Sequence, residues 1–189
     1  MTDPRDLVVA ITGASGSVLG VRILELLAEL PDVTTHLVLT SGGKATMALE
    51  LPGGVERVEE LADHVYRARD TGCRLASGSF RTAGMIIAPC SIKTLSAVAN
   101  SFSSNLVTRA ADVTLKERRP LLLALRETPL HAGHLRMAAD LSALGAIIYP
   151  PVPAFYLKPE SVEQLVDDLA ARILDQFDID VTHMRRWDG

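Results

Sequence analysis

The chain has 189 residues, of which 48% are hydrophobic, 22% charged and 4% aromatic. This composition is typical of a packed globular domain and excludes a disordered or low-complexity protein. The formal net charge of −4 gives no overall attraction for nucleic acid or an anionic membrane, so we expect neither as a partner. Any phosphate binding must therefore come from local clusters of basic residues.

The residues that often hold metals or disulfides form no convincing pattern. Cys73 and Cys90 make neither a disulfide framework nor a metal-ligand spacing. His131 and His134 lie three residues apart, but without a third ligand a solvated helix face is favoured over a metal site. The opening segment MTDPRD lacks the pattern of a signal peptide, and no apolar run approaches membrane-spanning length. We expect a cytoplasmic protein with no metal and no membrane segment.

The first distinctive stretch is a predicted strand, a glycine-rich turn and a helix. Residues 7–11 are uninterruptedly apolar, as in a buried parallel strand, and apolar residues recur at helical spacing from Val18 to Leu27. Between them, the residues from Gly13 to Ser17 are small, and two carry hydroxyls. Backbone N–H groups and the helix dipole converge at such a turn, which predicts an anion site. The alternative is a tight turn without a ligand.

The second predicted strand, residues 33–39, argues against a dinucleotide. A dinucleotide site normally has an acidic residue at this strand's end, to bind a ribose hydroxyl. This chain has Thr40, Ser41, Gly42 and Gly43 there, and it also lacks the Tyr-x-x-x-Lys pair of nicotinamide reductases. Hydroxyls and glycines favour a smaller phosphate-bearing ligand.

The rest of the chain alternates between helices and strands. We expect helices over 44–51, 55–63, about 90–99, 105–117, 130–144 and 160–176, and strands over 85–88, 121–125 and 146–149. Residues 64–83 are irregular, and 150–159 form a proline-rich extended loop. The last helix would bury Val162, Leu165, Val166, Leu169 and Ile173. This order predicts a single α/β domain, a doubly wound parallel sheet of about five or six strands, with a core from 7 to 178 and a polar tail over 179–189 that includes Trp187.

Three further segments carry residues suited to chemistry. Arg126 and Glu127 follow a buried strand, at the sheet edge where ligands bind, although a surface ion pair is the alternative. The segment 91–94 begins a helix, where it either caps the helix or binds phosphate. Arg109 and Lys116 are two turns apart, near one helix face.

Several segments, in this order and spacing, closely resemble the UbiX-like flavin prenyltransferases, which include the B subunits of hydroxyarylic acid decarboxylase systems. The segments are ITGASGSVLG, ASGSFRTAGM, APCSIKT, ADVTLKERRP, LALRETP and VPAFYLKP. The resemblance implies a Rossmann-like, flavodoxin-like domain that assembles as a homododecamer with sites between subunits. It also implies transfer of the dimethylallyl group of dimethylallyl phosphate to N5 and C6 of reduced FMN. The product, prenylated FMN, would serve as cofactor for a UbiD-like decarboxylase.

The resemblance also assigns site residues. It implies FMN contacts at Gly13, Ala14, Ser15, Thr40 or Ser41, Ser91, Ile92, Lys93, Thr94 and Arg126. The prenyl phosphate would meet Lys116, Tyr156 and Arg172, with Arg109 nearby and Glu50 as a further acidic position. Ser15 and Glu127 match the positions implicated in proton handling, and Lys116 and Tyr156 would stabilise the departing phosphate.

The chain departs from the family pattern at two places, and two alternative functions can be compared with its residues. Family members usually have a serine and a lysine where this chain has Thr40–Gly43, and many have a tyrosine at Leu19, which is expected to alter the wall of the prenyl pocket. An FMN-dependent cysteine decarboxylase would need a histidine base and a Pro-x-Met-Asn segment, but Pro89 leads into Cys90 here. A non-catalytic flavin-binding paralogue would lack the phosphate-binding residues, which are all present. The choice between a mono- and a diphosphate donor stays open.

Overall fold

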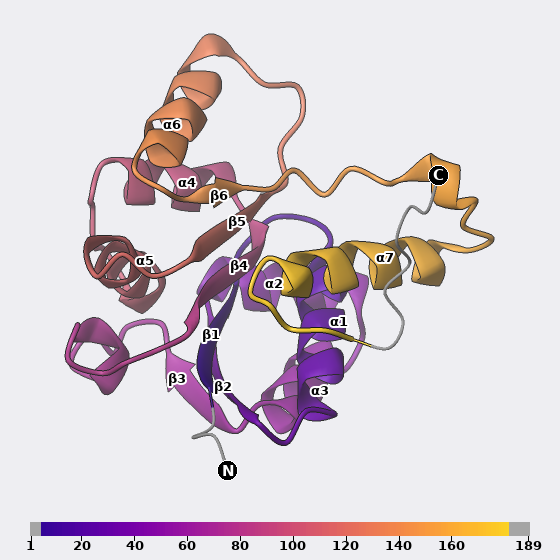
Figure 1. Cartoon of the computed structure of the whole chain (residues 1–189), viewed down its shortest axis with the longest axis horizontal. Coiled ribbons are helices and arrows are strands. Elements are labelled where there is room, and N and C mark those ends of the chain that lie inside the picture. Colours follow the sequence, from indigo (N-terminus) through magenta and orange to yellow (C-terminus); the bar gives the residue numbers. More distant parts are fainter. Residues whose placement is uncertain (1–4, 182–189) are drawn as a thin grey trace.

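The computed structural model describes residues 5–181, so the expected features of 182–189, including Trp187, lie outside the described residues. Its centre is a six-stranded sheet of order β3-β2-β1-β4-β5-β6, in which all neighbouring strands run parallel (Figure 1). The strands are β1 (Arg5–Ile11), β2 (Val33–Leu39), β3 (His64–Arg67), β4 (Gly84–Cys90), β5 (Leu121–Leu125) and β6 (Ile147–Ile148). This is the single doubly wound α/β domain that the sequence predicts.

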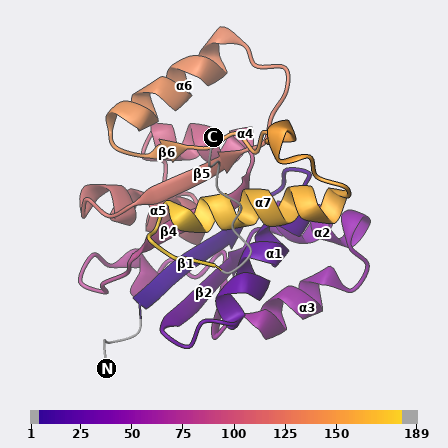
Figure 2. The same ribbon diagram turned by 45° about the vertical axis from the view of Figure 1, so that its right-hand side comes forward.

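Helices cover both faces of the sheet. They are α1 (Ser17–Ala28), α2 (Ser41–Glu50), α3 (Gly54–Leu61), α4 (Ile92–Ala99), α5 (Leu106–Lys116), α6 (Ala132–Ala143) and α7 (Val162–Asp175), with short 3-10 turns η1 (Arg74–Ala76) and η2 (Phe155–Leu157). Helices α1, α2, α3 and α7 pack on one face and α4, α5 and α6 on the other, as Figure 2 shows. The central strand β1 is therefore apolar on both faces: Leu7, Val9 and Ile11 enter one core, and Val8 and Ala10 the other.

The structure differs from the predicted elements at β3 and α2. Residues 64–67, expected to be irregular, form the edge strand β3, which pairs only with β2 and exposes His64, Val65 and Arg67. Helix α2 starts at Ser41, three residues earlier than expected, because the Thr40 hydroxyl caps it by accepting the Gly43 N–H at 2.9 Å.

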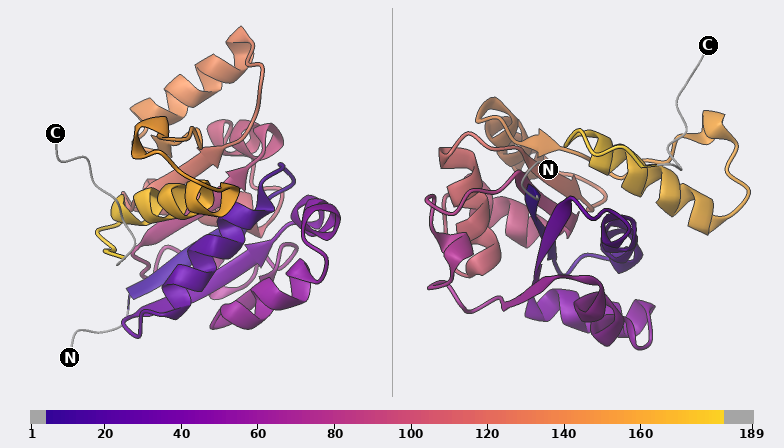
Figure 3. Two further views of the ribbon diagram at one scale, coloured as in Figure 1. Left: turned by 90° about the vertical axis from the view of Figure 1, so that its right-hand side faces the viewer. Right: turned by 60° about the horizontal axis from the view of Figure 1, so that its bottom comes forward.

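The C-terminal part of the domain also differs from the prediction. Val162 is 68% exposed rather than buried, because the start of α7 and the segment before it extend away from the sheet (Figure 3). Ile173 is buried as predicted, whereas Leu165, Val166 and Leu169 are only partly buried. The other buried residues of α7 are Ala170, Ala171 and Leu174. The predicted polar tail begins too early, since Ile179 and Val181 pack into the core.

Within residues 5–181, no helix has both the length and the apolar character needed to cross a membrane.

Candidate functional site

A cavity of about 1110 Å³ opens at the carboxyl ends of the strands. Its wall is formed by the segments that follow successive strands: Gly13–Ser15 after β1, Thr40–Gly42 after β2, Ala68–Arg69 after β3, Ser91–Thr94 after β4 and Arg126–Glu127 after β5. Strand order reverses between β1 and β4, and open parallel sheets bind ligands at such a switch point. The fold thus brings together polar segments that are far apart in the sequence.

The residues expected to contact FMN all line this cavity, and Glu127 does so as well. They are Gly13, Ala14, Ser15, Thr40, Ser41, Ser91, Ile92, Lys93, Thr94 and Arg126. Both Thr40 and Ser41 are included, so the structure does not select one of them.

The N-terminus of α1 is occupied by a carboxylate of the protein itself. The Glu50 carboxylate accepts the backbone N–H of Gly16 at 3.0 Å and that of Ser17 at 2.8 Å, and it also interacts with the Ser15 side chain. The prediction that these N–H groups are available to a ligand anion is therefore wrong. The sequence places Glu50 at the end of α2, and only the tertiary fold brings it to the glycine-rich turn.

The same contacts set the ionisation of Glu50. Partial burial opposes ionisation of this carboxyl, but hydrogen bonds from the Ser15 side chain and from the backbone of Ser17 and Gly16 outweigh that effect. The pKa of Glu50 therefore lies below its ordinary value, and the side chain is charged at neutral pH.

The turn after β2 depends on a close backbone contact. A Cβ at Gly43 would lie 2.5 Å from the carbonyl oxygen of Ile11, so only glycine allows α2 to start against the end of β1. This contact explains the second of the two glycines that follow Thr40 and Ser41, whereas a Cβ at Gly42 would lie 3.2 Å from the Cα atom of Gly13.

A residue that the sequence did not single out, Thr12, links the ends of β1 and β4. Its hydroxyl donates to the carbonyl of Pro89 at 2.8 Å and accepts the N–H of Ser91 at 2.8 Å. Ser91 in turn caps α4 by accepting the Thr94 N–H at 3.3 Å. Burial raises the pKa of the neighbouring Cys90 to about 12, so its thiol stays protonated and packs in the core rather than acting as a nucleophile.

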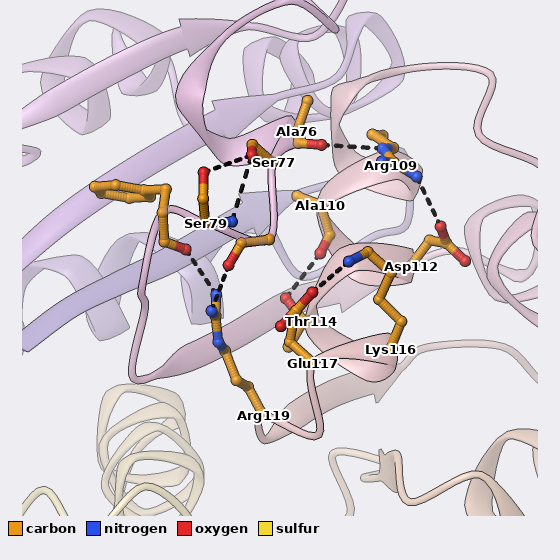
Figure 4. Close-up of polar contacts among 12 residues, drawn as sticks. Ala76, Ser77, Ser79, Arg109, Ala110, Asp112, Thr114, Lys116, Glu117 and Arg119 are labelled. Carbon is orange, nitrogen blue, oxygen red and sulfur yellow. Dashed lines mark hydrogen bonds and ion pairs between the residues drawn. The ribbon is translucent and has the colours of Figure 1, made fainter.

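The residues expected to bind the prenyl phosphate do not line the cavity of a single chain. Arg109 donates to the carbonyl of Ala76 at 3.1 Å, and Lys116 pairs with Glu117 beside the loop 76–80 (Figure 4). Arg119 holds this loop by donating to the carbonyls of Gly78 at 2.8 Å and Phe80 at 2.7 Å. The loop 76–80 therefore packs against the basic end of α5.

The other two phosphate candidates lie together on a second surface. Tyr156, in η2, is 61% exposed, and Arg172 on α7 is exposed and pairs with Asp175. Each lies near enough to the half-buried Tyr149 to act on it electrostatically. Helices α5 and α7 cover opposite faces of the sheet, so one chain carries two separate clusters of phosphate-binding candidates in addition to the cavity (Figure 1).

The structure also places three further residues that the sequence singled out: Leu19, His131 and His134. Leu19 is 5% exposed and packs in the core, and it is not among the residues that line the cavity. His131 caps α6 by accepting the Gly133 N–H at 3.0 Å, and its ring lies 3.5 Å from that of His134. Among residues 5–181, no group of three or more potential ligands is placed to hold a metal.

Sequence comparison finds close relatives over almost the whole chain. Residues 1–174 match the family model described as Flavoprotein. The chain is 50% identical over 187 residues to flavin prenyltransferase UbiX of Salmonella typhimurium, covering 98% of this chain and 99% of the relative. It is 52% identical over 183 residues to flavin prenyltransferase UbiX of Thauera aromatica, covering 97% and 94%.

Solved structures agree with these matches. AnUbiX (PadA1), in complex with FMN and dimethylallyl pyrophosphate, superposes with a TM-score of 0.96 at 47% identity, covering 98% of both chains. A dodecameric FMN-dependent UbiX-like decarboxylase from Escherichia coli O157:H7 gives a TM-score of 0.95 at 46% identity, covering 97% of this chain and 100% of the other. The FMN-dependent cysteine decarboxylase TvaF shares the fold, with a TM-score of 0.63 at 19% identity over 88% of this chain and 98% of the other.

Proposed function

Since the chain belongs to the UbiX-like flavin prenyltransferases of the flavoprotein family, we propose that it makes prenylated FMN. In this reaction the dimethylallyl group of dimethylallyl phosphate is joined to N5 and C6 of reduced FMN, and phosphate is released. The product serves as cofactor for a UbiD-like decarboxylase. The observation that carries the proposal is the convergence on one cavity of all the residues expected to contact FMN.

The allylic phosphate is the leaving group, so negative charge grows on its oxygens as the C–O bond breaks. Cations and hydroxyl donors fixed around those oxygens stabilise the transition state by about 3 kcal/mol each. Lys116, Arg172 and Tyr156 supply such groups, with Arg109 close to Lys116 on α5. Donors of this kind perform the task without a carboxylate cluster for a divalent cation.

Ring closure requires the loss of a proton from C6 of the flavin. Glu127 is suited to accept it, because it lies on the cavity wall at the end of β5. Ser15, also on the wall, contacts the ionised Glu50 and can relay a proton. The departing phosphate is a further acceptor.

The two clusters of phosphate-binding candidates indicate how the site is completed. Arg109 and Lys116 on α5, and Tyr156 and Arg172 near α7, all lie outside the cavity of their own chain. We infer that a homododecamer, the assembly of the E. coli relative, brings these clusters from neighbouring copies to the cavity. The flavin is thus bound mainly by one chain and the prenyl phosphate by residues of several.

The alternative functions have less support. A cysteine decarboxylase would need a histidine base, but none of the described residues that line the cavity is a histidine. The similarity to TvaF is confined to the fold. A non-catalytic paralogue is disfavoured because Lys116, Glu127, Tyr156 and Arg172 are all retained.

Phosphate release tests the proposal. Under anaerobic conditions, with reduced FMN and dimethylallyl phosphate, we expect one phosphate released per flavin consumed. Release that does not depend on FMN would contradict a prenyl transfer to the flavin.

We also propose a cytoplasmic location, which the unpaired Cys73 and Cys90 support.

A further inference from the structure

Two arginines that play no part in the function described so far lie on the cavity wall. Arg67 ends β3 and Arg69 follows it, and both line the cavity. Neither guanidinium forms a hydrogen bond or an ion pair with any other described residue, whereas Lys44 on the same wall is neutralised by Glu59 at 2.6 Å. This side of the cavity therefore carries uncompensated positive charge.

The backbone that carries these arginines is fixed on both sides. The Tyr66 hydroxyl lies 3.1 Å from Nδ1 of His36, a fully buried residue whose Nε2 lies 2.7 Å from Asp6. The carbonyl of Ala68 accepts the backbone N–H of Leu106 at 2.7 Å, at the start of α5. A short edge strand would otherwise be free to shift, so these contacts hold the two arginines at a constant place on the wall.

The surroundings favour an anion on the same side. Arg67 is paired in register with Leu39, which directly precedes the hydroxyls of Thr40 and Ser41 at the start of α2. The positive end of α2 adds to the charge of the arginines, whereas the corresponding end of α1 is already neutralised by Glu50.

We propose that Arg67 and Arg69 bind the phosphate of FMN, together with the hydroxyls of Thr40 and Ser41. The inference rests on the proposed function, since it names the part of the flavin that this side of the cavity binds. It assigns the two phosphates of the reaction to different cations: that of the flavin to the arginines after β3, and that of the prenyl donor to the clusters on α5 and near α7. The flavin ring then extends toward Arg126 and Glu127, on the far side of the switch point.

Binding of FMN and riboflavin tests this assignment, because riboflavin has the same ring and side chain but no phosphate. The variants are Arg67→Gln, Arg69→Gln and the double variant, and the matched control is Arg136→Gln, an exposed position on α6 away from the cavity. We expect each single substitution to raise the Kd for FMN roughly 10-fold, and the double substitution to raise it further. The Kd for riboflavin stays unchanged in all variants, and the control behaves as wild type.

Ionic strength provides a second readout. The wild-type affinity for FMN is expected to fall as salt is added, and this dependence weakens in the double variant because two of the interacting charges are gone. The midpoint temperature of thermal unfolding is measured for each variant, and a midpoint equal to that of wild type shows that the fold is intact.

Three results would overturn the assignment. The first is an unchanged Kd for FMN in the double variant, and the second is an equal loss of FMN and riboflavin binding, which would indicate altered packing. The third is a raised KM for dimethylallyl phosphate with the affinity for FMN retained, which would assign the arginines to the other phosphate. Failure of the prenyl transfer itself gives a different pattern, in which wild-type protein binds FMN more tightly than riboflavin but leaves its mass unchanged.

Discussion

The carboxylate of Glu50 accepts the backbone N–H of Ser17 at 2.8 Å, although the two residues belong to successive strand–helix units. Helix α1 is therefore capped by a side chain from the end of α2 rather than by its own Gly16, which cannot supply a side-chain acceptor. Glu50 thus supplies the negative charge at the positive end of α1.

Glu50→Gln tests this cap. At neutral pH we expect the free energy of unfolding to fall by about 1 kcal/mol, because an amide is a weaker acceptor for backbone donors at a helix N-terminus. The folded-state pKa of Glu50 lies below the ordinary value of 4.5, so its contribution is present above that pH and is lost as pH falls through the folded-state pKa. The difference between wild type and variant should therefore shrink in acid. Urea titrations of both proteins at neutral and at acid pH measure this difference in the free energy of unfolding.

The exposed Glu60 on α3 offers a matched control for that substitution. Glu60→Gln removes the same charge without touching a helix N-terminus, so its stability should match wild type at neutral pH. A Glu50→Gln effect no larger than that of the control would contradict the cap.

Tyr156→Phe tests the role assigned to the η2 turn. Loss of one hydroxyl donor to the departing phosphate is expected to lower kcat/KM for dimethylallyl phosphate by roughly 10- to 100-fold. The Kd for FMN should not change, because Tyr156 is assigned to the prenyl phosphate and does not belong to the residues proposed to contact the flavin. Steady-state kinetics gives kcat/KM, and flavin titration gives the Kd for FMN. An equal loss of kcat/KM and of affinity for FMN would rule out the assignment.

Mixed assemblies test whether neighbouring copies complete one site. Lys116→Ala removes a phosphate-binding cation, and Arg126→Ala removes a residue of the flavin cavity, so each variant alone should be inactive. If the two side chains act in the same site but come from different chains, co-assembled variants form some intact sites and regain part of the activity. Activity that stays at the level of the separate variants, with mixed assembly shown by mass spectrometry, would indicate sites built from single chains.

The buried His36 is expected to make stability depend on pH. Burial lowers the pKa of His36 and outweighs the opposing effect of Asp6; His64 and Arg74 lower it further. Between the folded-state pKa and 6.5 the unfolded chain binds more protons than the folded protein, so the free energy of unfolding decreases as pH falls through this window. His36→Gln should remove this slope and, by breaking the contacts to Asp6 and Tyr66, cost about 2 kcal/mol at higher pH.

His64 stacks on His36, with ring centroids 4.9 Å apart, so its contribution needs a control of its own. His64→Gln should retain most of the wild-type slope, because this side chain is exposed. A slope that disappears with His64 rather than His36 would show that the buried residue is not responsible.

The sequence predicts well the parts of the fold that are buried on both faces. Strands β2 and β5 occupy the predicted ranges, because helices cover both of their faces, and β5 (LLLAL) is a continuous apolar run. The residues that follow the buried strands β4 and β5 reach the cavity by topology alone. This is why Arg126 and the segment 91–94 could be proposed as site residues without coordinates.

Features that depend on long-range contacts were not predictable in this way. Strand β3 lies at the edge of the sheet and is mostly exposed, so it has no apolar run, and Arg67 and Arg69 stayed hidden in a segment expected to be irregular. The hydrogen bond from the Ser17 N–H to the Glu50 carboxylate spans 33 residues of sequence, so no local sequence pattern predicts it. The exposure of Val162 follows from the projection of α7 beyond the sheet, which helical periodicity does not reveal.

The central claim, that this chain prenylates FMN, is tested most directly by the mass of the flavin after one turnover. Purified protein is incubated anaerobically with reduced FMN and dimethylallyl phosphate, and the flavin is released and analysed by mass spectrometry, with Lys116→Ala as the matched control. We expect the wild-type flavin to gain the mass of one C5H8 unit and the control flavin to gain little. A flavin of unchanged mass from wild-type protein that has bound FMN would contradict the claim.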